Sequence, residues 1–265
     1  MKFASFPKFV LFSLLAGVFA LVLAGCGASN NLALTQGNWS MTATPSAGAT
    51  FYIGGNLTQS GTNLVGTMYV ISFPNCYSPS QTVAFTGTVK GKNVTLTSNS
   101  VGGQVISIIA TGTAGSLTGT YSIAGGTTCN GDSGTLTATP VPSISATWIG
   151  PIVDANGDKV ILSMALTQAA TASPDGTFAL TGNLTYTGST CSVSGTLPAG
   201  SAFIAGTYIV MQGNTIEFDG SPGTFTYYPA FLNNPTLPIN MQGTYTQTFG
   251  VCTDNAGNAA TFTKQ

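Results

Sequence analysis

The side chains that carry most enzyme chemistry are scarce in this chain. It has no histidine and no arginine, which excludes Ser-His-Asp and Cys-His catalysis and removes bidentate phosphate clamps. One closely spaced acidic pair, Glu217 and Asp219, alternates on a predicted strand, so the two carboxylates would share one face. Such a pair suggests a carboxylate-based glycan hydrolase. The glycine-rich sequence after it favours a solvated hairpin end instead, and we expect a non-enzymatic protein.

Two further segments resemble a calcium loop and a Ser-Lys catalytic dyad, but both are better interpreted as turns. Residues 154–158 (DANGD) match the first five positions of a calcium loop, but Lys159 replaces its sharp-turn glycine and Ala165 its bidentate glutamate. The Asn-Gly pair inside this segment predicts a hairpin turn by itself. A Ser-Lys dyad would need Lys90 or Lys92, which flank a glycine in a predicted exposed turn. We therefore expect neither a metal nor a cofactor.

An aromatic segment near the C-terminus is the best candidate for binding. Residues 225–232 (FTYYPAFL) run into an Asn-Asn-Pro sequence and have no counterpart earlier in the chain. We interpret them as an inserted, proline-bounded loop. Its rings, Tyr227, Tyr228 and Phe231, could stack on sugars or line an apolar pocket. The alternative, which the pattern favours, is a loop folded onto the protein's own domains or their junction.

The N-terminus predicts export. Lys2 and Lys8 precede an uncharged apolar run of about 15 residues, which is shorter than the roughly 20 needed to span a bilayer. The run ends in Leu-Ala-Gly-Cys at residues 23–26, which resembles the lipobox of bacterial lipoproteins. This resemblance implies cleavage before Cys26, lipid attachment to its sulfur, and a palmitate-bearing anchor in the cell envelope. Because Gly27 stands where an aspartate would signal inner-membrane retention, the resemblance favours the outer membrane.

Composition narrows the partners of the mature chain. Removal of residues 1–25 leaves 240 residues with four lysines and seven acids, a formal charge of −3. This argues against nucleic-acid binding, which needs a cationic surface. Only 5% of the residues are charged, so neutral Thr, Ser, Asn and Gly supply the polar surface.

Four cysteines follow Cys26, an even number that is typical of disulfides in exported proteins. They are Cys76, Cys129, Cys191 and Cys252. None forms a CxxC pair, and without histidine a zinc site would need all four thiolates. Four cysteines allow three disulfide connectivities.

Short alternating segments, broken by Gly, Asn and Pro, predict an all-β protein. In the first half they are residues 42–44, 51–59, 64–72, 82–89, 93–97, 104–111, 117–123 and 135–139. In the second half, residues 148–153 and 159–168 have the same character. About eight strands with short connections predict an antiparallel meander, closed as a barrel or folded as a sandwich.

The chain then repeats itself. Trp39 precedes a Leu-Thr-Gln triplet by 18 residues, and Trp148 precedes the same triplet by the same distance. A Gly-Thr-Tyr triplet precedes Cys129 and another precedes Cys252. We therefore predict a tether at residues 26–36 and two tandem homologous domains, 37–140 and 143–265, separated at a Pro-Val-Pro sequence. Duplication favours one disulfide within each half, Cys76 with Cys129 and Cys191 with Cys252.

The first domain opens with Gly37-Asn38-Trp39, which resembles the Gly-x-Trp start of lipocalins. The resemblance covers three residues, and the second domain has alanine in place of that glycine. It implies a barrel, and a bacterial branch of that family is lipid-anchored. We expect an envelope lipoprotein that binds or scaffolds a small apolar ligand, a glycan or an envelope protein. An apolar lumen would favour ligand carriage, and a filled core with exposed edge strands would favour assembly by strand pairing.

Overall fold

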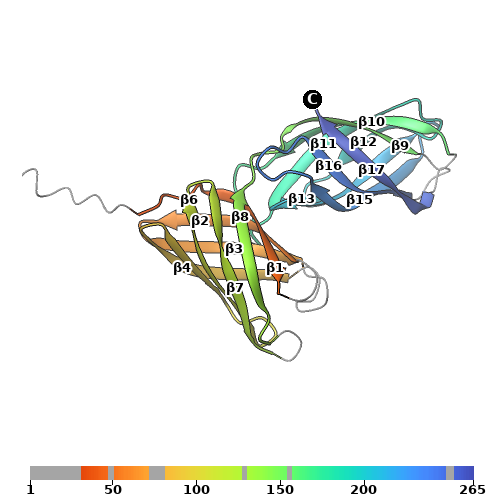
Figure 1. Cartoon of the computed structure of the whole chain (residues 1–265). Coiled ribbons are helices and arrows are strands. Elements are labelled where there is room, and N and C mark those ends of the chain that lie inside the picture. The colour runs from red at the N-terminus through yellow and green to blue at the C-terminus, as the bar shows by residue number, and fades with distance from the viewer. Residues whose placement is uncertain (1–30, 47–50, 72–80, 127–129, 154–156, 249–253) are drawn as a thin grey trace, which may run out of the picture. The chain divides into compact units, whose positions relative to one another are not determined.

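The structure is a computed structural model that describes residues 31–46, 51–71, 81–126, 130–153, 157–248 and 254–265. Within these ranges the regular secondary structure consists of antiparallel strands, and no helix is present (Figure 1). The strands form two closed barrels in tandem, lipocalin-like in architecture: the first has eight strands, and the second has eight positions, one of which is shared by two short strands. The predicted all-β meander is confirmed, as a barrel rather than a sandwich. The predicted signal segment and Cys26 lie outside the described residues.

Barrel 1 is an uninterrupted meander in which each strand pairs with the next. Its strands are β1 (Gly37–Pro45), β2 (Phe51–Ser60), β3 (Asn63–Ile71), β4 (Gln81–Lys90), β5 (Asn93–Ser98), β6 (Gln104–Thr113), β7 (Ser116–Gly125) and β8 (Ser133–Pro140). Pairing of β1 with β8 closes the barrel, with Met41 opposite Ala138. Closure gives every strand two neighbours.

Barrel 2 repeats this plan with one change. Its strands are β9 (Ala146–Val153), β10 (Lys159–Gln168), β11 (Phe178–Thr187), β12 (Ser192–Leu197), β13 (Ala202–Ala205), β14 (Tyr208–Glu217), β15 (Pro222–Leu232), β16 (Asn240–Thr248) and β17 (Asp254–Lys264). The barrel closes through β9–β17 and β10–β11 pairing. The fourth position is divided, because β12 and β13 each pair with a different part of β14. Residues 198–201 lie between them.

Local sequence explains the strands and their turns. In β5 (NVTLTS) alternate side chains are buried and exposed, as expected of a strand with one face in a core. The turn between β4 and β5 contains Gly91 with a φ of +61°, in the left-handed region that glycine adopts at low cost. Lys90 pairs with Asn93 across this turn, which confirms the predicted exposed turn.

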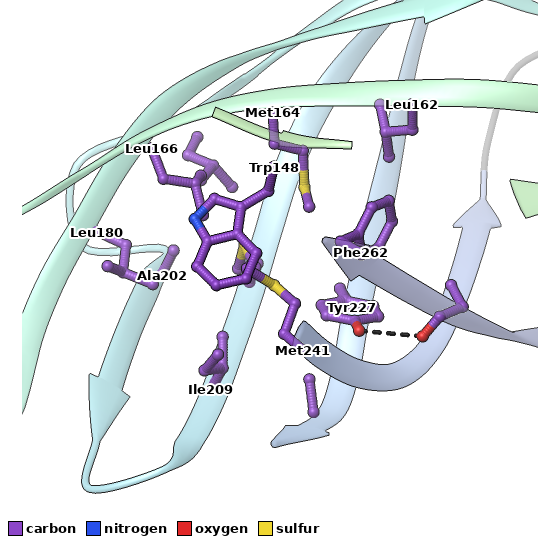
Figure 2. Close-up of a cluster of buried hydrophobic side chains, with 14 of the residues drawn as sticks. Trp148, Leu162, Met164, Leu166, Leu180, Ala202, Ile209, Tyr227, Met241 and Phe262 are labelled. Carbon is purple, nitrogen blue, oxygen red and sulfur yellow. Dashed lines mark hydrogen bonds between the residues drawn. The ribbon is translucent and has the colours of Figure 1, made fainter. Parts of the chain in front are cut away.

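Side chains fill the interior of each barrel. Two separate clusters of buried apolar residues form the cores, one per barrel. Trp39 and Trp148 are each fully buried. Figure 2 shows Trp148 packed among Leu166, Met164 and Met241 in barrel 2. The interior is therefore a packed core, and neither tryptophan lines an open lumen.

The duplicated Trp and Gln residues have the same structural role in both halves. In barrel 1 the indole N–H of Trp39 donates to the carbonyl of Thr35 at 2.7 Å, and Gln59 accepts from the backbone N–H of Leu34 at 2.7 Å. In barrel 2 the Trp148 indole donates to the Ile144 carbonyl at 2.9 Å. Gln168 accepts from the Ile144 N–H at 3.0 Å. The equal spacing thus encodes a plug that closes the end of each barrel.

The two barrels contact each other through backbone as well as side chains. The amide of Asn38 exchanges two hydrogen bonds with the backbone of Gly206, at 3.1 and 2.7 Å. A Cβ atom added at Gly54 would lie only 2.2 Å from the carbonyl oxygen of Ala205. Glycine is required there because no side chain fits between the two backbones.

Candidate functional site

Six aromatic side chains, contributed by both barrels, form one continuous group that we call the seam cluster. Its members are Tyr52 on β2, Tyr69 on β3, Phe203 on β13, Tyr208 at the start of β14, and Tyr228 and Phe231 on β15. Tyr208 contacts four of the other rings, and it stacks on Tyr69 with ring centroids 5.8 Å apart. Phe231 reaches Tyr52 at 5.7 Å.

The outer part of the seam cluster is open to solvent. Tyr228 is 49% exposed, whereas Tyr208 is buried beneath it. Burial, followed by hydrogen bonding and charge repulsion with Tyr228, raises the pKa of Tyr208 far above its ordinary value. Tyr208 therefore stays neutral within the seam cluster.

A β-bulge decides which aromatic residues of β15 reach this cluster. The pairing of β15 with β16 shifts register between Tyr227 and Ala230, so Tyr228 and its neighbour Pro229 both face outward. Tyr227 points inward, contacts Phe262 edge-on at 5.1 Å and donates to the carbonyl of Ala260 at 3.1 Å (Figure 2).

Two sequence-based interpretations of this segment were therefore wrong. Residues 225–232 belong to a strand and not to an inserted loop, and β15 has the same position in barrel 2 as β6 in barrel 1. Of the three predicted binding aromatics, Tyr227 is a core residue, fully buried, while Tyr228 and Phe231 lie in the seam cluster. The expected packing against a domain junction is confirmed by the contact of Phe231 with Tyr52.

A hollow opens where the fourth strand of barrel 2 is divided, and we call it the strand-break hollow. Its volume is about 360 Å³. The carbonyl of Ser201 accepts from Gln212 N–H at 3.0 Å, and the ring of Phe225 occupies the space where a side chain at Gly213 would lie. The polar side chains that line the hollow are all neutral: Ser201, Gln212, Asn214, Thr224 and Thr226.

The strand-break hollow and Tyr228 lie on one outward strip. Thr226 and Tyr228 are two residues apart on β15 and both face away from the core, which separates them by about 7 Å along the strand. A second hollow, of about 490 Å³, lies beside residues 35–38, the segment 140–143 and Phe178. The strand-break hollow is the better candidate for ligand binding, because its hydrogen-bonding groups lie near the exposed ring of Tyr228.

The acidic pair does not form a paired-carboxylate site. Glu217 ends β14 and is 1% exposed, whereas Asp219 lies in the turn that follows and is fully exposed. The expectation that both share one face of a strand is wrong, and so is a solvated position for Glu217. Asp219 fits the hairpin-end interpretation, since hydrogen bonds from the Ser221 hydroxyl and backbone N–H lower its pKa.

Glu217 instead belongs to a polar layer inside barrel 2. It pairs across strands with Ser192, whose hydroxyl accepts from the amide of Gln247 at 2.7 Å. The hydroxyl of Tyr245 donates to Gln247 at 3.3 Å and lies 2.9 Å from that of Tyr186. Buried polar groups need such partners, and this layer holds one end of the barrel in a single arrangement.

The remaining predicted site residues are only partly within the described structure. Cys191 is buried beside β12, whereas Cys76, Cys129 and Cys252 lie outside the described residues, so both disulfides stay predictions. Most of the calcium-like segment also lies outside them. Within the described residues, no three His, Cys, Asp or Glu side chains are grouped to hold a metal ion. The described residues also contain no helix that is long and apolar enough to cross a membrane.

Comparison with protein families, curated proteins and solved structures finds no match to this chain.

Proposed function

We propose that this protein is a lipid-anchored lipoprotein of the bacterial cell envelope, most consistent with the outer membrane, that binds a neutral glycan without catalysis. The lipobox-like segment ending at Cys26 supports the anchor. The observation that carries the binding proposal is the strip formed by Tyr228 and the strand-break hollow. It joins a half-exposed ring to neutral amide and hydroxyl groups.

The filled barrel interiors support a ligand on the outer surface. Both cores consist of packed side chains. Closure also leaves the strands paired on both sides, which argues against assembly by strand addition. For the described residues, this geometry favours a ligand on the outer surface over the two alternatives, ligand carriage in a lumen and pairing at edge strands.

The chemistry of the strip supports a sugar over a charged ligand. Sugar rings present apolar C–H faces that pack on aromatic rings, and hydroxyls that bond to amides and hydroxyls. No charged side chain lines the hollow. Its volume lies within the range of small-molecule sites in proteins. We propose that Tyr228 stacks on one sugar ring while Gln212 and Asn214 bond to the next.

A glycan-binding measurement with matched variants tests this proposal. Neutral oligomers of glucose, mannose and N-acetylglucosamine are titrated calorimetrically, and reaction products are analysed in parallel. Tyr228→Ala should weaken binding about tenfold, the value of an aromatic contact. Phe218→Ala is the control, because Phe218 is 63% exposed outside the strip. Equal affinities of the two variants would refute the site, and hydrolysis that Glu217→Gln abolishes would refute the non-catalytic role.

The anchor has its own test. Labelled palmitate should be incorporated into the full chain and lost in Cys26→Ala. Label that persists in this variant would contradict acylation at Cys26 and leave the glycan site unaffected.

A further inference from the structure

The start of the described chain is attached to one end of barrel 1. Residues 32–36, which we call the strap, cross this end. The backbone N–H of Leu32 donates to the carbonyl of Gly91 at 2.8 Å, and that of Thr35 donates to Ala114 at 3.1 Å. Gln59 adds a hydrogen bond to the Leu32 carbonyl at 2.9 Å. The strap end therefore consists of the strap and three hairpin turns, those between β2 and β3, β4 and β5, and β6 and β7.

A short chain connects this end to the proposed lipid. Leu32 follows Cys26 by six residues. Since an extended chain spans at most about 3.6 Å per residue, the backbone of Cys26 can lie no further than roughly 22 Å from that of Leu32, whatever path the chain takes. The ten residues of β7 separate the two ends of barrel 1 by about 30 Å of strand, so the lipid keeps the strap end near the bilayer.

The charges of barrel 1 are divided between its two ends. Lys90 and Lys92 flank the β4–β5 turn at the strap end, and both are exposed. The single acid of barrel 1, Asp132, lies at the opposite end, where it accepts a hydrogen bond from Tyr121 at 2.9 Å. The end that the tether holds at the membrane is thus the basic one.

We propose that the strap end of barrel 1 is a membrane-facing surface whose lysines, Lys90 and Lys92, bind the phosphates of anionic lipid headgroups. The inference rests on the proposed acylation of Cys26. The acyl chains supply the durable attachment. Each lysine near an anionic surface contributes about a fivefold preference for it, which orients barrel 1 on the bilayer.

Lysine labelling of the acylated, mature protein tests the orientation. The protein is reconstituted on vesicles of phosphatidylcholine with phosphatidylglycerol, or held in neutral detergent, and treated with an amine-reactive reagent. Modification at each lysine is measured by mass spectrometry. On vesicles Lys90 and Lys92 should react severalfold more slowly than in detergent, because anionic headgroups bind their ammonium groups. Lys159, exposed on barrel 2, is the internal control and should not change. Equal reactivity of Lys90 and Lys92 in the two settings would overturn the proposal.

Partitioning between vesicles tests the two charges directly. Acylated wild-type protein should prefer anionic over neutral vesicles by about 30-fold, and the double variant Lys90→Gln/Lys92→Gln should lose this preference while it stays membrane-bound. Lys159→Gln should behave as wild type. A double variant that keeps the preference overturns the headgroup site but not the anchor. A wild-type protein that does not bind vesicles overturns both.

Discussion

Barrel 1 keeps one uninterrupted fourth strand, β4, whereas barrel 2 divides the same position between β12 and β13. The division opens the strand-break hollow beside β14 and β15. The bulge in β15 then turns Tyr228 outward next to it. Two local irregularities thus distinguish the outer surface of barrel 2 from that of barrel 1, while the Trp and Gln contacts at the barrel end are the same in both.

The two barrels also differ in charge. Barrel 1 carries two lysines and one acid, a formal charge of +1, and barrel 2 carries two lysines and six acids, a charge of −4. Barrel 2 also buries the polar layer of Glu217, Ser192 and Gln247. This asymmetry agrees with the two proposals, which put barrel 1 at an anionic membrane and a glycan-binding site on barrel 2.

The largest expected effect is a loss of stability that is confined to one barrel core. Trp39→Ala should destabilise barrel 1 by about 3–5 kcal/mol, because a fully buried indole leaves a cavity, and Trp148→Ala should do the same to barrel 2. The chain has two tryptophans, so each variant retains one that reports on the other barrel. Unfolding in guanidinium is followed by its fluorescence and by circular dichroism. A remaining tryptophan whose transition shifts as much as the mutated barrel would contradict independent cores.

A smaller effect is expected where the barrels touch. Gly54→Val should cost about 1–3 kcal/mol, because its Cβ would overlap the Ala205 carbonyl and force the backbones apart. Proteolysis within residues 141–145 should become faster as the barrels separate. Gly115→Ala is the control, since a Cβ there meets no atom within 4 Å. If both variants resist protease equally, the glycine contact does not hold the barrels together.

Alkaline pH should distinguish the barrels further. Burial raises the pKa of Tyr186, Tyr227 and Tyr245 in barrel 2, and burial with an Asp132 hydrogen bond raises that of Tyr121 in barrel 1. A raised pKa means that the folded state favours neutral tyrosine. Each of these tyrosines therefore contributes its full share to the free energy of unfolding below pH 10. As the pH rises from 10 through the folded-state pKa, that contribution falls by about 1.4 kcal/mol per pH unit for each tyrosine.

With four such tyrosines, Tyr208 of the seam cluster included, against one among the described residues, barrel 2 should unfold first above pH 10. Tyrosinate absorbance and the fluorescence of each tryptophan follow the transitions. Tyr186→Phe and Tyr245→Phe should shift the transition of barrel 2 to higher pH, with Tyr121→Phe as the matched change in barrel 1. Simultaneous alkaline unfolding of both barrels would contradict this difference.

Much of the fold could be predicted from local patterns. Alternation identified β10 with the bounds that the structure has, and glycine turns located most hairpins. The repeated Trp and Gln spacing indicated the duplication, because both residues serve the same plug. The four other members of the seam cluster were missed. Tyr52 and Tyr69 stand on β2 and β3 like ordinary outward tyrosines, and no signal along the chain says that a second barrel covers them.

The sequence also did not predict which side chains of β14 and β15 face the core. In β14 both alternating sets contain apolar residues, so period-2 patterning could not decide which set faces the core. The structure buries Met211, Thr215 and Glu217 and leaves Ile216 and Phe218 exposed. In β15 the segment interpreted as a loop is a strand, and Tyr227, which precedes the bulge, faces the core.

The sequence by itself determined the strands, their turns, the duplicated plugs and the scarcity of charge, because each depends on residues close together or on composition. Only the tertiary structure decided that the meanders close into barrels, that Glu217 lies inside and that six aromatic rings converge. Closure, burial and convergence depend on pairing between residues far apart in the chain. Alternation along one strand gives two faces but does not say which of them another strand or barrel will cover.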